Sequence, residues 1–130
     1  MEIKIGTKGI VTDKVTEENT AKTVGSGSLD VFATPSMIAL MEKASCVAIE
    51  SFLDEGATTV GTMINAEHLS ATPIGCEITV ESIVTAVEGR RISFEVTACD
   101  TAGLIGKGTH DRFIVDKERF MSKANTKNKL

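Results

Sequence analysis

The chain has 130 residues, 42% of them hydrophobic, which suits one domain with a single core. Lysine and arginine number 14 against 18 acidic residues, and this net charge of −4 argues against a general nucleic-acid-binding protein, which would normally show a basic face. The longest uncharged runs, 31–41 and 56–66, are too short to span a bilayer, so no membrane partner is expected.

The cysteines and the N-terminal segment indicate where the protein works. Cys46, Cys76 and Cys99 are an odd number without the spacing of zinc ligands. We interpret them as reduced, small hydrophobic residues. The N-terminal segment has no apolar stretch of signal-peptide length. A cytoplasmic protein is therefore expected.

The first clear element along the chain is a helix. Residues 8–24 are β-prone but weakly patterned, and the "GSGS" of residues 25–28 is typical of a flexible loop. Thr34 and Pro35 then predict a helix start, with Thr34 as the N-cap and Pro35 in the first helical position. The helix is expected to end near Leu53, before the "DEG" of residues 54–56.

Four runs with period-two alternation follow and predict strands at about 60–68, 78–86, 92–98 and 104–115. In the first run, Val60 begins an apolar face that His68 closes, and Gly61 lies on the opposite face. A long helix followed by an antiparallel meander predicts an α+β fold in which a curved sheet wraps around the helix. Residues 1–123 are expected to form one domain, and residues 124–130 a polar tail.

Glu42 is the unusual residue of the predicted helix. On a helical wheel it lies among Ile38, Ile49 and Leu53, away from the solvent side marked by Lys43. No basic residue lies within one turn on its face. Glu42 is either a boundary residue that reaches water or a desolvated carboxylate suited to act as a general base or nucleophile.

Two further positions favour the second interpretation. His68 is predicted to point inward, where a lone histidine is more often a hydrogen-bonded core residue than a catalyst. Gly61 leaves room for a ligand to approach the strand backbone. With Thr34 at the helix start, these residues would provide a hydroxyl, a carboxylate and an imidazole. Elsewhere, His110 is interpreted as structural, and Arg90-Arg91 as a solvated pair at a turn that could meet phosphates of coenzyme A (CoA).

The motifs "VFATPSMIALMEKASC", "VGTMINAEHLSATPIG", "VEGRRISFEV" and "GKGTHDRFIV" occur in this order. Together they resemble the fluoroacetyl-CoA thioesterase group of hotdog-fold proteins, from about Gly25 to Lys123. The resemblance implies a hotdog fold and hydrolysis of an acyl-CoA with a short or small acyl group to free acid and CoA. It implies no metal and no cofactor, because CoA is part of the substrate.

The resemblance also assigns roles to individual residues. It implies catalytic roles for Thr34, Glu42 and His68. Glu42 would attack the thioester carbonyl or activate water, Thr34 would help hold the substrate or the oxyanion, and His68 would move protons. The substrate-binding residues that it implies are Gly61, Arg112 and Phe32.

One difference from the fluoroacetyl enzyme refines these expectations. That enzyme carries a longer, phenylalanine-bearing lid just before the "VFAT" position, where this chain has only "GSGSLD". Thioester hydrolysis is therefore expected without strong selectivity for fluoroacetyl.

Two other functions stay open: a non-catalytic acyl-CoA-binding hotdog protein, and a hotdog hydratase or dehydratase.

The spacing of Thr34 and Glu42 bears on the oligomeric state. Eight residues of helix separate them by about 12 Å along the axis. Residues of one chain would therefore not meet, whereas a two-fold partner could bring one chain's residue to the other's. A homodimer or a higher oligomer, with its site at the interface, is expected.

Overall fold

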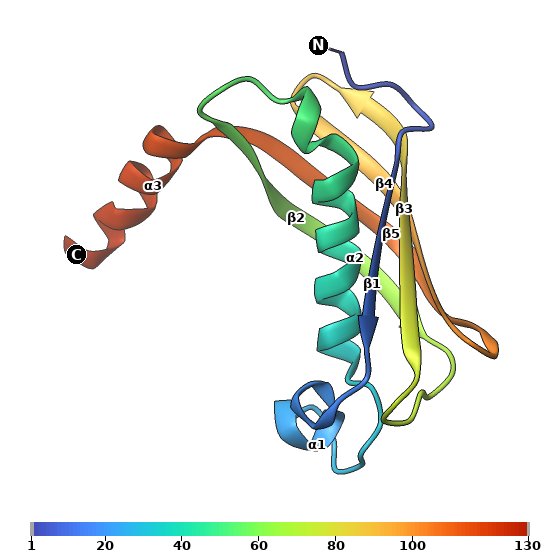
Figure 1. Ribbon diagram of the computed structural model, residues 1–130. Coiled ribbons are helices and arrows are strands. Elements are labelled where there is room, and N and C mark those ends of the chain that lie inside the picture. The colour runs from blue at the N-terminus through green and yellow to red at the C-terminus, as the bar shows by residue number, and fades with distance from the viewer. Residues whose placement is uncertain (1, 130) are drawn as a thin grey trace.

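The computed structural model describes residues 2–129. Five antiparallel strands form one sheet in the order β1-β3-β4-β5-β2, and the sheet curves around the long helix α2, Thr34–Ile49 (Figure 1). The strands are β1 Lys8–Lys14, β2 Ala57–His68, β3 Glu77–Glu88, β4 Arg91–Asp100 and β5 Gly103–Asp116. The predicted α+β architecture and all four predicted strands are confirmed.

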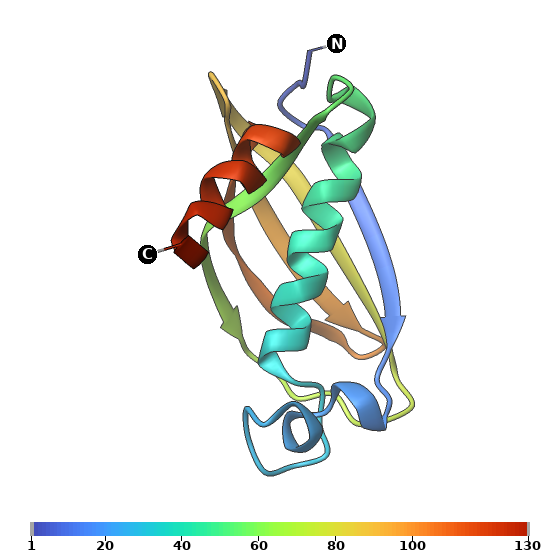
Figure 2. The same ribbon diagram turned by 90° about the vertical axis from the view of Figure 1, so that its left-hand side faces the viewer.

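Short helices occupy the two ends of the fold. A 3₁₀ turn (Glu17–Asn19) and α1 (Ala21–Val24) lie near the start of α2, and α3 (Lys117–Asn125) projects from the sheet after β5 (Figures 1 and 2). A 3₁₀ turn at Thr126–Lys129 follows α3, so helical structure covers most of the predicted polar tail. Within residues 2–129, no helix has the length and apolar character needed to cross a membrane.

The core lies between α2 and the concave face of the sheet. Met37, Met41 and Ala44 of α2 are fully buried, as are Ile78 and Phe94 on the strands that face them. At Gly9 of β1, a Cβ atom would overlap the backbone carbonyl of Ala44. Glycine therefore allows β1 to pack directly against the helix backbone.

The start of α2 differs from the prediction in one respect. Ala33, not Thr34, is the N-cap residue, and it makes no side-chain capping bond. Thr34 is the first helical residue, and its hydroxyl is bonded to His68 instead. The helix ends at Ile49, and a 3₁₀ turn at Glu50–Phe52 fills the remainder of the predicted span.

A β-bulge in β2 changes which residues share a face. The register with β5 shifts between Gly61 and Met63, and a bulge of this kind reverses the alternation of side chains. Thr59 and Gly61, which precede the bulge, face inward, and His68, which follows it, also faces inward. The prediction that Gly61 and His68 lie on opposite faces is therefore wrong.

Candidate active site

The first group of predicted site residues forms at the start of α2. The Thr34 hydroxyl oxygen lies 2.7 Å from Nδ1 of His68, at the end of β2. Phe32, which is buried, packs against the His68 ring in an edge-on arrangement with ring centroids 6.4 Å apart. The structure thus brings together three of the six predicted site residues.

The protonation state of His68 suits proton transfer. Burial disfavours the imidazolium form and lowers the pKa of His68 below 6.5, although the backbone of Ser70 partly opposes this shift. Its buried Nε2 has no hydrogen-bond partner among the described residues. The pair borders a hollow of about 250 Å³ that Ser26 and Ala71 also line. A neutral imidazole beside a hydroxyl can accept a proton from a group entering that hollow.

The second group forms halfway along α2. The Glu42 carboxylate lies 3.4 Å from a terminal nitrogen of Arg112 on β5. It also lies against Gly61, where an added Cβ would stand 2.6 Å from the carboxylate oxygen. The Glu42 side chain is 43% exposed. Glycine therefore leaves an accessible carboxylate beside the strand backbone, with a cation next to it.

This environment corrects the expectation of an apolar setting without a basic partner. Arg112 follows Glu42 by 70 residues, so a helical wheel cannot reveal it. The side chain is also half-exposed within the single chain rather than desolvated. A carboxylate that water can reach and that a cation orients can still act as a base or nucleophile.

Two residues outside the predicted set hold Arg112 in place. Thr59 accepts hydrogen bonds from Arg112 through its hydroxyl at 2.8 Å and its carbonyl at 3.0 Å. Nε2 of His110 lies 3.2 Å from the arginine nitrogen that faces Glu42. Arg112 is buried, so these contacts fix the direction of its charge.

His110 can accept a bond from Arg112 because its ring is neutral. Nδ1 lies 2.7 Å from the Met63 carbonyl, which requires a proton on Nδ1 and leaves Nε2 free to accept. Burial chiefly lowers the pKa of His110, and the charge of Arg112 adds to this, while the Met63 carbonyl opposes it. The "GTHDR" motif contains a signal for this role, since residues two apart on a strand share a face.

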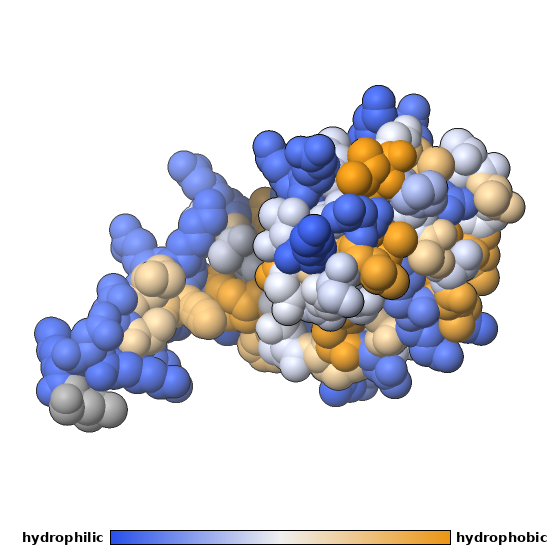
Figure 3. All heavy atoms as spheres, turned by 90° about the horizontal axis from the view of Figure 1, so that it is seen from below, coloured by the Kyte–Doolittle hydropathy of each residue, from blue (hydrophilic) through white to orange (hydrophobic). Residues whose placement is uncertain are grey.

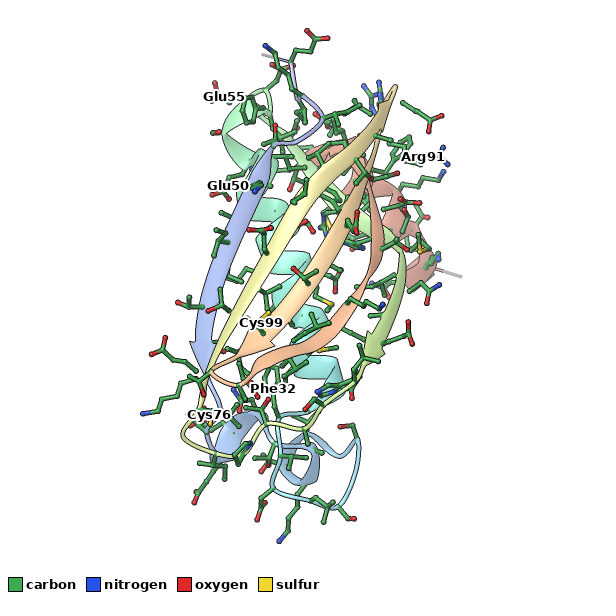
Figure 4. All side chains as sticks on the ribbon, turned by 90° about the vertical axis from the view of Figure 1, so that its right-hand side faces the viewer. Phe32, Glu50, Glu55, Cys76, Arg91 and Cys99 are labelled. Carbon is green, nitrogen blue, oxygen red and sulfur yellow. The ribbon has the colours of Figure 1, made fainter. Side chains whose placement is uncertain are left out.

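The two groups do not meet within one chain. Thr34 and Glu42 are separated by about 12 Å along α2, as expected from their spacing. Figure 4 shows Phe32 at one end of the sheet and Glu55 and Arg91 at the other. In a single chain, the hydroxyl–imidazole pair and the carboxylate are therefore separate sites.

Known thioesterases are similar to this chain in sequence. The family model described as "Fluoroacetyl-CoA-specific thioesterase" matches residues 15–118. A fluoroacetyl-CoA thioesterase from Streptantibioticus cattleyicolor is 42% identical over 98 residues, which cover 75% of this chain and 70% of the relative.

Solved structures extend the likeness to the whole fold. A crystal structure of the fluoroacetyl-CoA-specific thioesterase FlK has a TM-score of 0.92 and 33% identity, covering 98% of each chain. A thioesterase superfamily member from Thermus thermophilus has a TM-score of 0.91 and 28% identity, covering 98% of this chain and 95% of its own. The hotdog fold and the predicted family are thereby confirmed, and the chain belongs to the fluoroacetyl-CoA-specific thioesterase family.

Proposed function

We propose that the protein hydrolyses the thioester of a small acyl-CoA to the free acid and CoA, with Glu42 as the central catalytic group. The observation that supports this most directly is the accessible Glu42 carboxylate against the bare backbone of Gly61, in a member of a thioesterase family. The structure of a mutant of FlK has been solved in complex with acetyl-CoA, which is an ester of the proposed size class.

In the proposed reaction, an oxygen nucleophile adds to the thioester carbonyl carbon and the C–S bond then breaks. Glu42 either removes a proton from the attacking water or attacks the carbonyl itself, forming an anhydride that water cleaves. The neutral His68 takes up a proton released from the attacking water or supplied by solvent and passes it to the leaving thiolate, and the Thr34 hydroxyl donates a hydrogen bond to the developing oxyanion. This route requires no cofactor beyond the CoA that the substrate carries.

The separation of Thr34–His68 from Glu42 leads us to include a second copy of the chain. A homodimer in which the β2 strands pair antiparallel across a two-fold axis would extend the sheet. With the two-fold axis in the half of β2 that ends at His68, it would also place the His68 end of one β2 near the middle of the other. The site would then combine Glu42 and Gly61 of one chain with Thr34 and His68 of the partner.

The two edges of the sheet support this choice of interface. β1 carries a charged residue at each end and another within it, features that discourage edge-to-edge pairing. β2 is a 12-residue edge strand without lysine, arginine or proline. Met63 on this strand and Phe113 on its neighbour are 41% and 39% exposed.

The reduced cysteines are consistent with a cytoplasmic location, which we propose as well.

The test is a panel of short acyl-CoA esters with detection of the released thiol. We expect release of free thiol from acetyl-CoA or a similarly small ester. A hydratase would leave the thioester intact, and a binding protein would bind the ester without turnover. A solution mass that corresponds to an active monomer would refute the shared site.

The proposed role of Glu42 has its own test. Glu42→Gln should lower kcat by at least about a hundredfold, the scale of one acid–base or nucleophilic role, while the fold stays intact. Glu50→Gln, an exposed residue of the same helical region, is the matched control. A folded Glu42→Gln protein that hydrolyses acyl-CoA at the normal rate would exclude this role.

A further inference from the structure

One hollow of the described residues lies away from both groups of site residues. It measures about 590 Å³ and lies between α3, β5, the start of β2 and the turn that joins β3 to β4. Ile114 and Phe120 supply apolar wall, and Arg90, Arg119 and Lys123 supply three cations. The proposed reaction at Glu42 leaves this hollow without a role.

The hollow and Glu42 lie on the same face of the β2–β5 ladder. Gly61, Thr59 and Ala57 alternate along the inward face of β2, before the bulge. Gly61 contacts Glu42 and Ala57 lines the hollow. Four strand residues separate them by about 13 Å. The pantetheine arm that links the thioester of an acyl-CoA to its nucleotide has a comparable length.

The charges of the chain are also distributed unevenly, with a basic segment beside this hollow. We call residues 117–129 the arm; they hold five of the 14 basic residues and one of the 18 acidic residues. The body, residues 1–116, therefore holds nine basic and 17 acidic residues. Figure 3 shows the arm reaching away from the body, with mainly hydrophilic side chains on its surface. A cationic segment beside an acidic body would be the part that attracts an anion.

The cations of the hollow are available for a ligand. Asp54, Glu55 and Asp116 also line it, but among residues 2–129 none of them lies within 4.0 Å of a basic nitrogen of the three cations. Asp116 is engaged as the N-cap of α3, where it accepts the backbone N–H of Arg119 at 2.9 Å. The hydrogen bond from the Lys117 N–H to the Gly56 carbonyl, 2.9 Å long, fixes the arm over the hollow.

We propose that this hollow binds the 3′-phosphorylated adenosine diphosphate end of the substrate's CoA. Arg119, Lys123 and Arg90 contact the phosphates, and Phe120 and Ile114 pack against the adenine. This inference rests on the proposed function, because it takes the thioester to lie at Glu42. It assigns the arm a specific task, which is to recognise the end of the substrate that does not react.

The test compares two substrates with the same acyl group. Acyl-CoA carries the nucleotide, whereas acyl-pantetheine lacks it. Arg119→Gln/Lys123→Gln should lower kcat/KM for acyl-CoA by about tenfold, the scale of two partly exposed charged contacts. The same double variant should leave kcat/KM for acyl-pantetheine within about twofold. Lys117→Gln/Lys127→Gln removes the same charge from the arm outside the hollow and should change neither value by more than about twofold.

Several results would overturn the assignment. An equal loss on both substrates would indicate a structural effect, and an equal loss in both double variants would indicate only general attraction of anions. A change in solution mass that accompanies the loss would make these cations part of a subunit interface.

A protein that hydrolyses neither substrate would refute the proposed function first. The hollow would then be tested by titration with adenosine 3′,5′-bisphosphate. Binding that is lost only in Arg119→Gln/Lys123→Gln would uphold the nucleotide site, and no binding to the unmodified protein would overturn it.

Discussion

Thr34 directs its hydroxyl to a histidine rather than to its own helix. Because it makes no capping bond, its replacement should affect catalysis more than folding. Thr34→Val keeps the branched shape and removes the hydroxyl. We expect it to lower kcat by about a hundredfold, as for loss of an oxyanion donor, and to change the free energy of unfolding by less than about 1 kcal/mol.

Thr34→Ser is the matched variant for this residue, since it keeps the hydroxyl and should stay within about tenfold of the normal kcat. Steady-state kinetics and urea unfolding measure the two effects separately. If Thr34→Val retained full turnover while folding normally, the hydroxyl would have no part in the reaction.

The functional side chains illustrate what local sequence can and cannot predict. The motifs around Thr34, Glu42 and His68 indicate their importance, but their contacts depend on the fold. His68 follows Thr34 by 34 residues, and Arg112 follows Glu42 by 70. The cap was mispredicted for the same reason: a threonine before a proline is typical of an N-cap, and only the fold supplies a competing partner.

Among the secondary-structure elements, β2 shows how one bulge shapes the candidate site. Without the register shift after Gly61, either Gly61 or His68 would face outward. The four strands were predictable because each buries one face and alternates accordingly. The bulge was not, because Thr62 and Met63 fit an ordinary strand, and the sequence shows no break there.

Gly61→Ala tests the close approach of Glu42 to this strand. A Cβ atom at position 61 would stand only 2.6 Å from a carboxylate oxygen of Glu42. The carboxylate would therefore have to move, which it can do because it is the far end of a flexible side chain. We therefore expect a small change in melting temperature but at least a tenfold fall in kcat/KM, because the carboxylate moves away from its position beside Arg112. Thr62→Ala, at the next and exposed position, is the control. Normal activity in Gly61→Ala would show that the approach is not needed.

For the whole molecule, the two histidines predict how stability depends on pH. The pKa values of His68 and His110 are both lowered from 6.5, mainly by burial. In the unfolded chain the two histidines therefore bind protons near pH 6.5, whereas in the folded chain they bind protons only at a lower pH. Between these limits the unfolded state holds more protons, so stability falls as the pH falls. We expect the free energy of unfolding in urea to be lower at pH 5.5 than at pH 7.5.

A variant separates this effect from acid unfolding in general. The Thr72 hydroxyl is the main cause of the lowered pKa of Asp100, so the stability from that carboxylate is lost only below pH 3.8. His110→Asn should weaken the dependence between pH 7.5 and 5.5. Stability that stayed constant or rose toward pH 5.5 would contradict the neutral state of the two histidines.

Selectivity for the acyl group is also a property of the whole molecule, because it depends on what covers the site. The segment just before Val31 contains no aromatic residue between Thr16 and Asp30. Residues 25–30 are exposed, and the nearest aromatic residue, Phe32, is buried against His68. The hollow beside Thr34 therefore has a short Gly-Ser loop at its rim in place of an aromatic lid. Such a loop supplies little rigid surface to sense one fluorine atom.

We accordingly expect the preference for fluoroacetyl-CoA over acetyl-CoA to be at most about a hundredfold in kcat/KM, near the limit for a simple pocket and a one-group difference. Fluorine also activates the carbonyl chemically, so the ratio of the two esters' rates with hydroxide alone is the reference. Competition between the two esters in one solution measures the enzymatic ratio directly. If that ratio exceeded the chemical one by several orders of magnitude, selectivity would arise without a lid. The contacts around Thr34, His68 and Glu42 would then have to distinguish fluorine from hydrogen on their own.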